Sequence, residues 1–337
     1  MGSGTWSTDT YSLREEMRKK SGKDPFAYSA SATSDPNGPR AHPTLDPFGV
    51  KKRESCDNAE HPESVAIVVF FDVTGSMLSI PVTLQKKLPE LLGLLLRKGY
   101  VDHPQIMFGA IGDATCDQVP LQVGQFESDN RMDENLENIV LEGGGGGQKR
   151  ESYELAMYFV SEHTAIDCWE KRGHKGYLFM IGDEMAYPAV SRAHANKLIG
   201  DGLEKDMPLK EMLSRLRKCY EVFYILPKSA SHGGDKEVLA FWRQLLGENV
   251  LEIDDEAAVC ETIALTIGIR EGRIDLDDGV DHLKEMGVTD DKVLVSVSKA
   301  LAKLPGSSVP ATSSGAGLSG LSPDDPASGN PPKSRRL

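Results

Sequence analysis

Residues 65–79, with the sequence VAIVVFFDVTGSMLS, constrain the fold of this chain more than any other segment. Residues 65–71 are all apolar, and a short run rich in Val, Ile and Phe is typical of a strand buried on both faces of a parallel sheet. Asp72, Thr74 and Ser76 follow at once, where ligands of open α/β sheets bind. These oxygen donors suit Mg²⁺, Mn²⁺ or Ca²⁺. Alternatively, the hydroxyls only cap the next helix.

Strand and helix patterns alternate as far as residue 269. This alternation predicts an α/β fold, a doubly wound, mainly parallel sheet flanked by helices, as in Rossmann-like proteins. Pro89 is expected to kink the first helix, and Ser128 to cap the second. Further buried strands are predicted at 105–111, 176–181, 220–226 and 249–253, a short edge strand at 121–126, and helices at 79–98, 129–140, 209–218, 235–246 and 255–269.

The chain divides into four parts by composition. Residues 1–63 are polar and proline-rich, and we expect a flexible, mostly irregular N-terminal arm with one short helix. Residues 64–270 form the α/β domain. Residues 271–304 contain two short helical patterns and are expected to form a small helical extension. Residues 305–337 are rich in Ser, Gly, Pro and Ala, which predicts a disordered tail.

Charge and cysteine content exclude several classes of protein. The formal net charge of -13 and the isoelectric point near 5.2 argue against general nucleic-acid binding, which requires a basic face. No apolar run reaches the roughly 18 residues that a membrane span requires, and the N-terminus lacks the apolar core of a secretory signal. The five cysteines are widely spaced and form no C-x-x-C pair. We therefore expect a reduced, cytoplasmic protein of undetermined oligomeric state.

Three loops resemble those of one known family. The sequence FDVTGSM resembles the first motif, Asp-x-Ser/Thr-x-Ser, of von Willebrand factor A (VWA) domains, which carry a metal-ion-dependent adhesion site (MIDAS). Residues 145–151, GGGQKRE, are similar to the Gly-Gly-Gly-Asp-x-Pro-Glu loop of intracellular members. The predicted strand 176–181 ends in Gly182-Asp183, where the family has Thr-Asp or Ser-Asp. The resemblance covers residues 64–270 and implies the VWA fold.

The resemblance also implies a ligand set for a divalent metal. Asp72 would contribute charge, Thr74 and Ser76 neutral hydroxyl oxygens, and Asp183 a second carboxylate acting through a water molecule. Mg²⁺ is the favoured ion, with Ca²⁺ and Mn²⁺ as alternatives. Familiar members also contribute a threonine from the second loop, which this chain lacks. Counting from the following helix favours Glu151 as its replacement, counting from the glycines gives Gln148, and Ser152 is a third candidate.

The function that the resemblance implies is binding rather than catalysis. A MIDAS metal accepts a carboxylate from a partner protein, so we expect a docking protein within a multiprotein assembly and not an enzyme. One alternative is a Mg²⁺-dependent phosphohydrolase of the haloacid dehalogenase type. Those enzymes place Asp-x-Asp-x-Thr after the first strand, and here Thr74 replaces the second Asp, so the general acid is missing. Another alternative is a structural component of an assembly with a vestigial metal site.

Overall fold

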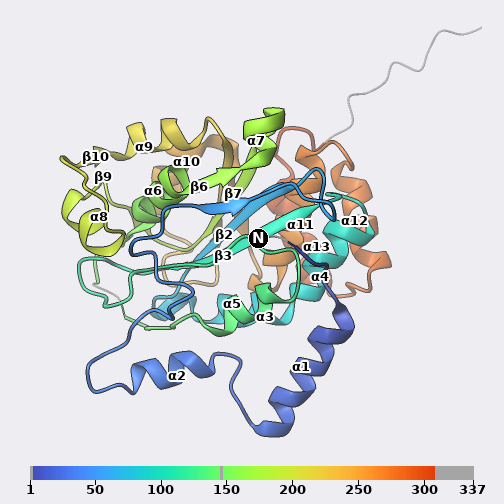
Figure 1. Ribbon diagram of the computed structural model, residues 1–337. Coiled ribbons are helices and arrows are strands. Elements are labelled where there is room, and N and C mark those ends of the chain that lie inside the picture. The colour runs from blue at the N-terminus through green and yellow to red at the C-terminus, as the bar shows by residue number, and fades with distance from the viewer. Residues whose placement is uncertain (1–2, 145–146, 308–337) are drawn as a thin grey trace, which may run out of the picture.

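The computed structural model describes residues 3–144 and 147–307. A six-stranded sheet lies at the centre of the α/β domain (Figure 1). The strand order is β12-β11-β7-β2-β3-β4. Neighbouring strands pair in parallel, except that β4 runs antiparallel to β3. The mainly parallel α/β fold is therefore confirmed. The strands are β2 (Val65–Asp72), β3 (Pro104–Ile111), β4 (Leu121–Val123), β7 (Gly176–Ile181), β11 (Tyr220–Pro227) and β12 (Val250–Ile253).

Helices cover both faces of the sheet. Because both faces of β2 are therefore buried, its residues 65–71 are all apolar. Ile67, Val69 and Phe71 belong to one hydrophobic core, whereas Val68 and Phe70 belong to the other. The first core includes side chains of α3 (Ser79–Lys86), α4 (Leu88–Leu92) and α11 (Val259–Arg270). The second includes side chains of α6 (Tyr153–His163), α9 (Leu209–Leu216) and α10 (Lys236–Leu246).

Two predicted helices differ from their observed form. The helix expected over 79–98 is interrupted between α3 and α4, where Pro89 is the second residue of α4, and a π-helical turn, Gly93–Arg97, follows. The single helix expected here, with a kink at Pro89, is therefore broken at Lys87, two residues before Pro89. The next helix, α5 (Arg131–Glu137), begins after Asn130, so the prediction that Ser128 caps it was wrong. The Ser128 hydroxyl instead donates to the carbonyl of Gly4, at 2.8 Å.

The N-terminal arm contains more structure than its composition predicted. It forms α1 (Thr8–Ser21), α2 (Ala27–Thr33) and β1 (Arg53–Ser55), and β1 pairs in parallel with β6 (Thr164–Ile166). The backbone N–H of Val123 in β4 donates to the carbonyl of Leu45, at 2.8 Å, and Leu45 is fully buried. The arm thus lies along the outer edge of the sheet at β4. These contacts join distant parts of the chain, so local composition could not reveal them.

The C-terminal extension forms the two expected helices, α12 (Leu276–Glu285) and α13 (Asp291–Leu301). The buried Ser296 hydroxyl of α13 accepts hydrogen bonds from the N–H groups of Asp254 and Asp255, directly after β12, at 2.9 and 3.2 Å. The predicted disordered tail lies outside the described residues from position 308 onward. Within the described ranges, no helix is both long and apolar enough to cross a bilayer.

Several short elements were not predicted from the sequence. Their few residues carry too little periodicity to be recognised. The strands β5 and β8 pair in parallel, and β9 and β10 pair antiparallel. The elements are α7 (Asp167–Arg172), α8 (Arg192–Leu198), β5 (Arg150–Glu151), β8 (Met185–Ala186), β9 (Ala189–Val190) and β10 (Met207–Pro208).

Candidate metal centre

The loop after β2 brings Asp72 and Thr74 into direct contact. Asp72 is fully buried, and its Oδ1 accepts hydrogen bonds from the backbone N–H and the hydroxyl of Thr74, at 2.7 and 2.5 Å. Thr74 precedes a short 3₁₀ turn, Gly75–Met77, but its side chain makes no capping bond there. The Thr74 hydroxyl therefore serves the carboxylate rather than the helix. Ser76 lies in the same turn, and its side chain is outside the described part of the structure.

Tyr153 completes the contacts of Asp72 and was missed by the sequence analysis. It is the first residue of α6, is fully buried, and donates its hydroxyl to Asp72 Oδ2 at 3.0 Å. A Cβ atom added at Gly182 would lie 1.8 Å from the Tyr153 hydroxyl oxygen. The glycine therefore provides room for the tyrosine hydroxyl. The one sequence signal for this arrangement is Gly182 itself, which replaces the hydroxyl residue of the family pattern.

Asp183 follows β7 and reaches the same end of the sheet. It is fully buried, and its Oδ2 accepts a hydrogen bond from the backbone N–H of His232, at 2.8 Å. Burial raises the pKa of Asp72 to about 7, the hydrogen bonds from Thr74 oppose this rise, and the negative charge of Asp183 adds to it. The two predicted carboxylates are thus close enough to interact electrostatically.

The three candidates from the second loop lie in different surroundings. Gln148 donates through Nε2 to Asp113 Oδ2 at 2.8 Å, and the Ser152 hydroxyl accepts from the N–H of Ala114 at 2.9 Å. Glu151 lies in β5, is 1% exposed, and its Oε2 is buried without a hydrogen-bond partner among the described residues. The glycine positions 145 and 146 lie outside the described ranges. Gln148 and Ser152 thus make hydrogen bonds to the loop at Asp113 and Ala114, whereas Glu151 has a buried oxygen without one.

Glu151 faces other carboxylates of the site. Its pKa is raised to about 11, first by burial and then by the negative charges of Asp72 and Glu184. The pKa of Glu184 is raised to about 7, again first by burial and then by Asp72 and Asp183. Glu184 also lies 3.7 Å from His232, measured from Oε1 to Nε2. The site therefore concentrates carboxyl groups in a buried region, where they favour the protonated form.

A neighbouring acid, Asp113 at the end of β3, is also buried, but its hydrogen bonds are satisfied. Thr115 N–H, Gln148 Nε2 and the Tyr187 hydroxyl donate to its carboxylate at 2.8 to 3.1 Å. Burial alone would raise the pKa of Asp113, but these hydrogen bonds outweigh it and the pKa is lowered. Asp113 is therefore stable as an anion without a metal, unlike Asp72 and Glu151.

The side chains gathered here offer oxygen atoms, the donor type that hard divalent cations prefer. Within residues 3–144 and 147–307, neither Asp72 nor Glu151 forms an ion pair with a lysine or arginine, and Lys149 is paired with Asp235 at 2.6 Å. Buried carboxylates without a cationic partner are strongly disfavoured as anions. In the same ranges, no group of three or more His, Cys, Asp or Glu side chains is placed to hold a metal ion. A cation here would therefore also require hydroxyl donors such as Thr74.

Comparison with known proteins gives only distant structural likenesses. No family model and no curated protein matches the chain. The pilus adhesin SpaC from Lactobacillus rhamnosus GG, in its open conformation, is similar at 9% identity with a TM-score of 0.41, over 65% of this chain and 31% of the adhesin. Proximal thread matrix protein 1 from the mussel byssus is similar at 12% identity with a TM-score of 0.40, over 64% and 48% of the two chains. Each comparison covers less than half of the known protein's own length. Likenesses this distant give no information about function.

Proposed function

We propose that this protein is a VWA-type binding module that docks a partner protein through a divalent cation of MIDAS type. One observation carries the proposal: the buried Asp72–Thr74 pair lies close to Glu151, whose carboxyl is hydrogen-bonded to another acid, Glu184, and whose buried Oε2 has no partner among the described residues. Such a carboxylate needs either a proton or a cation. The hard oxygen donors favour Mg²⁺, with Mn²⁺ or Ca²⁺ as alternatives.

Each residue of the site has a distinct role in this proposal. Asp72 and Thr74 hold the cation from the first loop, together with Ser76, and Asp183 contributes the second carboxylate through a water molecule. Tyr153 orients Asp72 through its hydrogen bond to Oδ2, as second-layer residues do in metal sites. When bound, Mg²⁺ supplies an electrophilic centre that a partner's carboxylate can coordinate.

The surplus of carboxylates sets the balance between holding the metal and holding the partner. Glu151 and Glu184 add negative charge beyond that of Asp72 and Asp183. Since they neutralise the cation, they favour tight retention of the metal and weaker attraction of an incoming carboxylate. We therefore expect the partner to bind through further contacts around the site as well, within a cytoplasmic multiprotein assembly.

We do not favour a phosphohydrolase, because Thr74 occupies the position at which those enzymes carry a general acid. The Thr74 hydroxyl donates to Asp72 Oδ1, the carboxylate that would have to act as the nucleophile. A structural protein with a vestigial site is the remaining alternative, and it predicts that assembly with partners does not require a metal.

Calorimetry on the full chain tests the proposal directly. Mg²⁺ and Mn²⁺ should bind wild-type protein at one site, and Asp72→Ala should abolish binding. Asp277→Asn is the matched control, because it removes an exposed carboxylate far from this loop in sequence. If Asp72→Ala is unstable, the isosteric Asp72→Asn replaces it, with circular dichroism as the test of folding.

Equal binding of divalent cations by the wild-type and Asp72→Ala chains would refute the metal site. Copurification of partners from cell extract, with and without a chelator, then separates the docking module from the structural alternative. Partners that are retained equally well in the presence of a chelator would favour the structural alternative.

A further inference from the structure

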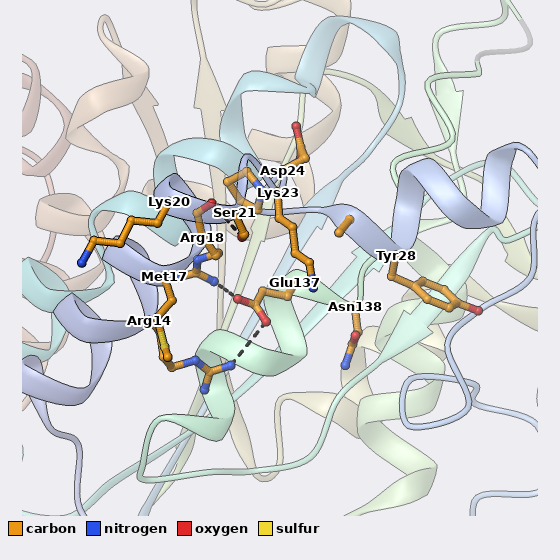
Figure 2. A pocket seen from close by; sticks show the side chains of 12 residues that line it. Arg14, Met17, Arg18, Lys20, Ser21, Lys23, Asp24, Tyr28, Glu137 and Asn138 are labelled. Atoms are coloured by element: carbon orange, nitrogen blue, oxygen red, sulfur yellow. Dashed lines mark hydrogen bonds and ion pairs between the residues drawn. The ribbon is translucent and has the colours of Figure 1, made fainter.

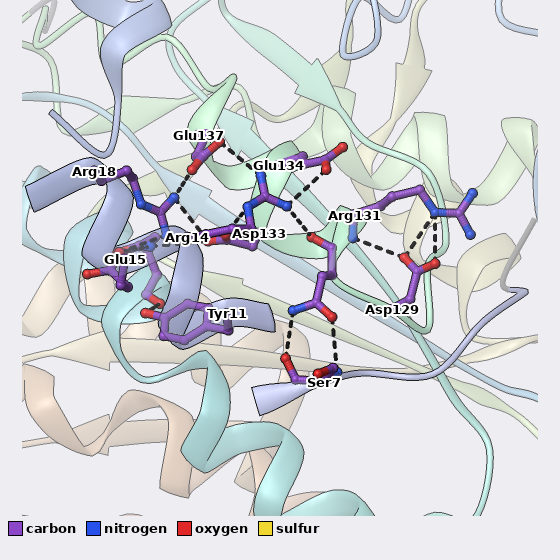
Figure 3. Close-up of polar contacts among 12 residues, drawn as sticks. Ser7, Tyr11, Arg14, Glu15, Arg18, Asp129, Arg131, Asp133, Glu134 and Glu137 are labelled. Carbon is purple, nitrogen blue, oxygen red and sulfur yellow. Dashed lines mark hydrogen bonds and ion pairs between the residues drawn. The ribbon is translucent and has the colours of Figure 1, made fainter. Parts of the chain in front are cut away.

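The helix α1 is held to the domain by charge more than by apolar packing. Tyr11 is its buried residue, whereas Leu13 and Met17 are 59% and 62% exposed. A helix without a broad apolar face is not stable by itself and needs specific polar contacts to stay in place. These contacts lie on α5, which faces α1 (Figure 3).

Three carboxylates of α5, Asp133, Glu134 and Glu137, form what we call the acidic face. Arg14 of α1 reaches all three: its Nη1 lies 2.9 Å from Glu134, its Nη2 3.3 Å from Glu137, and its Nε 3.4 Å from Asp133. One guanidinium thus bridges a triangle of carboxylates, a geometry that a lysine could not reproduce.

A second arginine, one helical turn later, completes the arrangement. Arg18 has an 11% exposed side chain, and it contacts Asp133 at 3.2 Å and also Glu137. Asp133 is fully buried, and Gln85 Nε2 donates to its Oδ1 at 3.1 Å. The acidic face is therefore a built site, with a buried carboxylate at its centre and two guanidinium groups seated in it.

An aromatic residue fixes the register of α1 on this site. The Tyr11 hydroxyl donates to the backbone carbonyl of Gln85 at 2.9 Å, and the ring packs against Trp6 with centroids 5.6 Å apart. Tyr11 precedes Arg14 by three residues, and Arg18 follows Arg14 by four, so all three lie on one side of the helix. The site thus recognises the helical pattern aromatic-x-x-Arg-x-x-x-Arg.

Solvent reaches part of these contacts: the Arg14 and Glu137 side chains are 24% and 26% exposed, whereas Asp133 is fully buried. A groove of about 710 Å³ runs between α1, the turn after it and α5, and Arg14, Arg18 and Glu137 line its wall (Figure 2). α1 ends at Gly22, which has a φ of 62°, whereas Phe26 just beyond is only 3% exposed. Release of α1 would leave this anchor of α2 in place but would break the two hydrogen bonds between the Ser7 backbone and Asn130, at 3.0 Å each.

We propose that the acidic face of α5 is a docking site for a basic helix of a partner protein, and that α1 is its intramolecular occupant. A partner helix with the pattern aromatic-x-x-Arg-x-x-x-Arg would displace α1 and take over its ion pairs. The surface uncovered by α1 is charged, so its transient exposure does not favour aggregation. The inference is independent of the metal site, because none of its residues belongs to that site.

The test uses the full chain and a fluorescent peptide of residues 3–22. Arg14→Glu/Arg18→Glu places glutamates against the acidic face and should release α1. The peptide should then bind this variant at least about tenfold more tightly than it binds wild type, since a competing ligand is removed. Binding, measured by fluorescence anisotropy, should weaken at least about tenfold when Asp133→Asn is added, and should also weaken as salt is raised.

Lys19→Glu/Lys20→Glu is the matched control, because it changes the same charge on the same helix at side chains that are 80% and 79% exposed. This variant should bind the peptide no better than wild type. The inference is overturned if the control binds as well as Arg14→Glu/Arg18→Glu, if neither variant binds, or if Asp133→Asn has no effect.

Hydrogen exchange on wild-type protein gives a second readout, should the arginine variant fail to fold. Excess peptide should accelerate exchange of the amides of α1 at least about tenfold while leaving β2 unchanged, because only α1 is displaced. A peptide with both arginines replaced by glutamate should have no such effect. Unchanged protection of α1 at saturating peptide would overturn the inference.

Discussion

The buried carboxyl of Asp72 should make the metal-free protein less stable as the pH rises. Asp72 is fully buried, and burial, reinforced by Asp183, raises its pKa from 3.8 to about 7. Between these two pKa values the unfolded chain has lost the proton that the folded chain retains. The free energy of unfolding therefore falls with each unit of pH in this range, and the full penalty is reached above the folded pKa.

The size of the effect follows from the shift. About three pKa units correspond to roughly 4 kcal/mol, of which more than half is lost between about pH 5 and about pH 8. This is a substantial part of the stability of an ordinary domain. If a divalent cation binds the ionised Asp72, adding Mg²⁺ should restore stability at the alkaline end and leave the acidic end almost unchanged.

Denaturant unfolding across this pH range, in chelator and in Mg²⁺, measures the effect. Asp72→Asn keeps the shape of the side chain but cannot ionise, so it should flatten the pH dependence by roughly 2–3 kcal/mol. Asp277→Asn, at an exposed position, should follow wild type. If Asp72→Asn loses as much stability as wild type between the two ends of the range, the burial argument fails.

Three further predictions test the site and its supports. Burial and neighbouring carboxylates raise the pKa of Glu151 to about 11 and that of Asp72 to about 7, so cation binding near neutral pH should release at least about one proton. Calorimetry in buffers of different ionisation enthalpy measures this release, and Glu151→Gln should reduce it. Gly182→Ala places a methyl against the Tyr153 hydroxyl, so denaturant unfolding should show a loss of about 1–3 kcal/mol, partly recovered in Tyr153→Phe. Ser296→Ala leaves two N–H groups without their acceptor and should lower the free energy of unfolding by about 1–2 kcal/mol, seen as a lower melting temperature.

The sheet could be predicted from the sequence because its strands are short apolar runs covered by helices on both faces. β2 is the clearest case, since the side chains at 66–71 alternate between two cores. The arm could not be predicted in the same way. Its order depends on contacts such as that between Leu45 and Val123, which join segments far apart in sequence and leave no local period.

The candidate site shows the same division between local and distant contacts. Asp72 and Thr74 are two residues apart, so their proximity follows from the motif. The choice between Gln148 and Glu151 depends on the tertiary environment, because β5 pairs with β8 and places Glu151 beside the other acids. Tyr153 lies far from Asp72 in sequence, so the hydrogen bond between them could not be predicted from the Asp72 motif.

The path of the arm along β4 and β6 has a consequence for how the chain is made. Residues 45–55 leave the ribosome long before their partners at 121–123 and 164–166 exist. Residues 45–55 must therefore wait, unpaired, until up to about half of residues 64–270 have emerged. Its polar, proline-rich composition suits this interval, because such a segment resists premature strand pairing with neighbouring nascent chains.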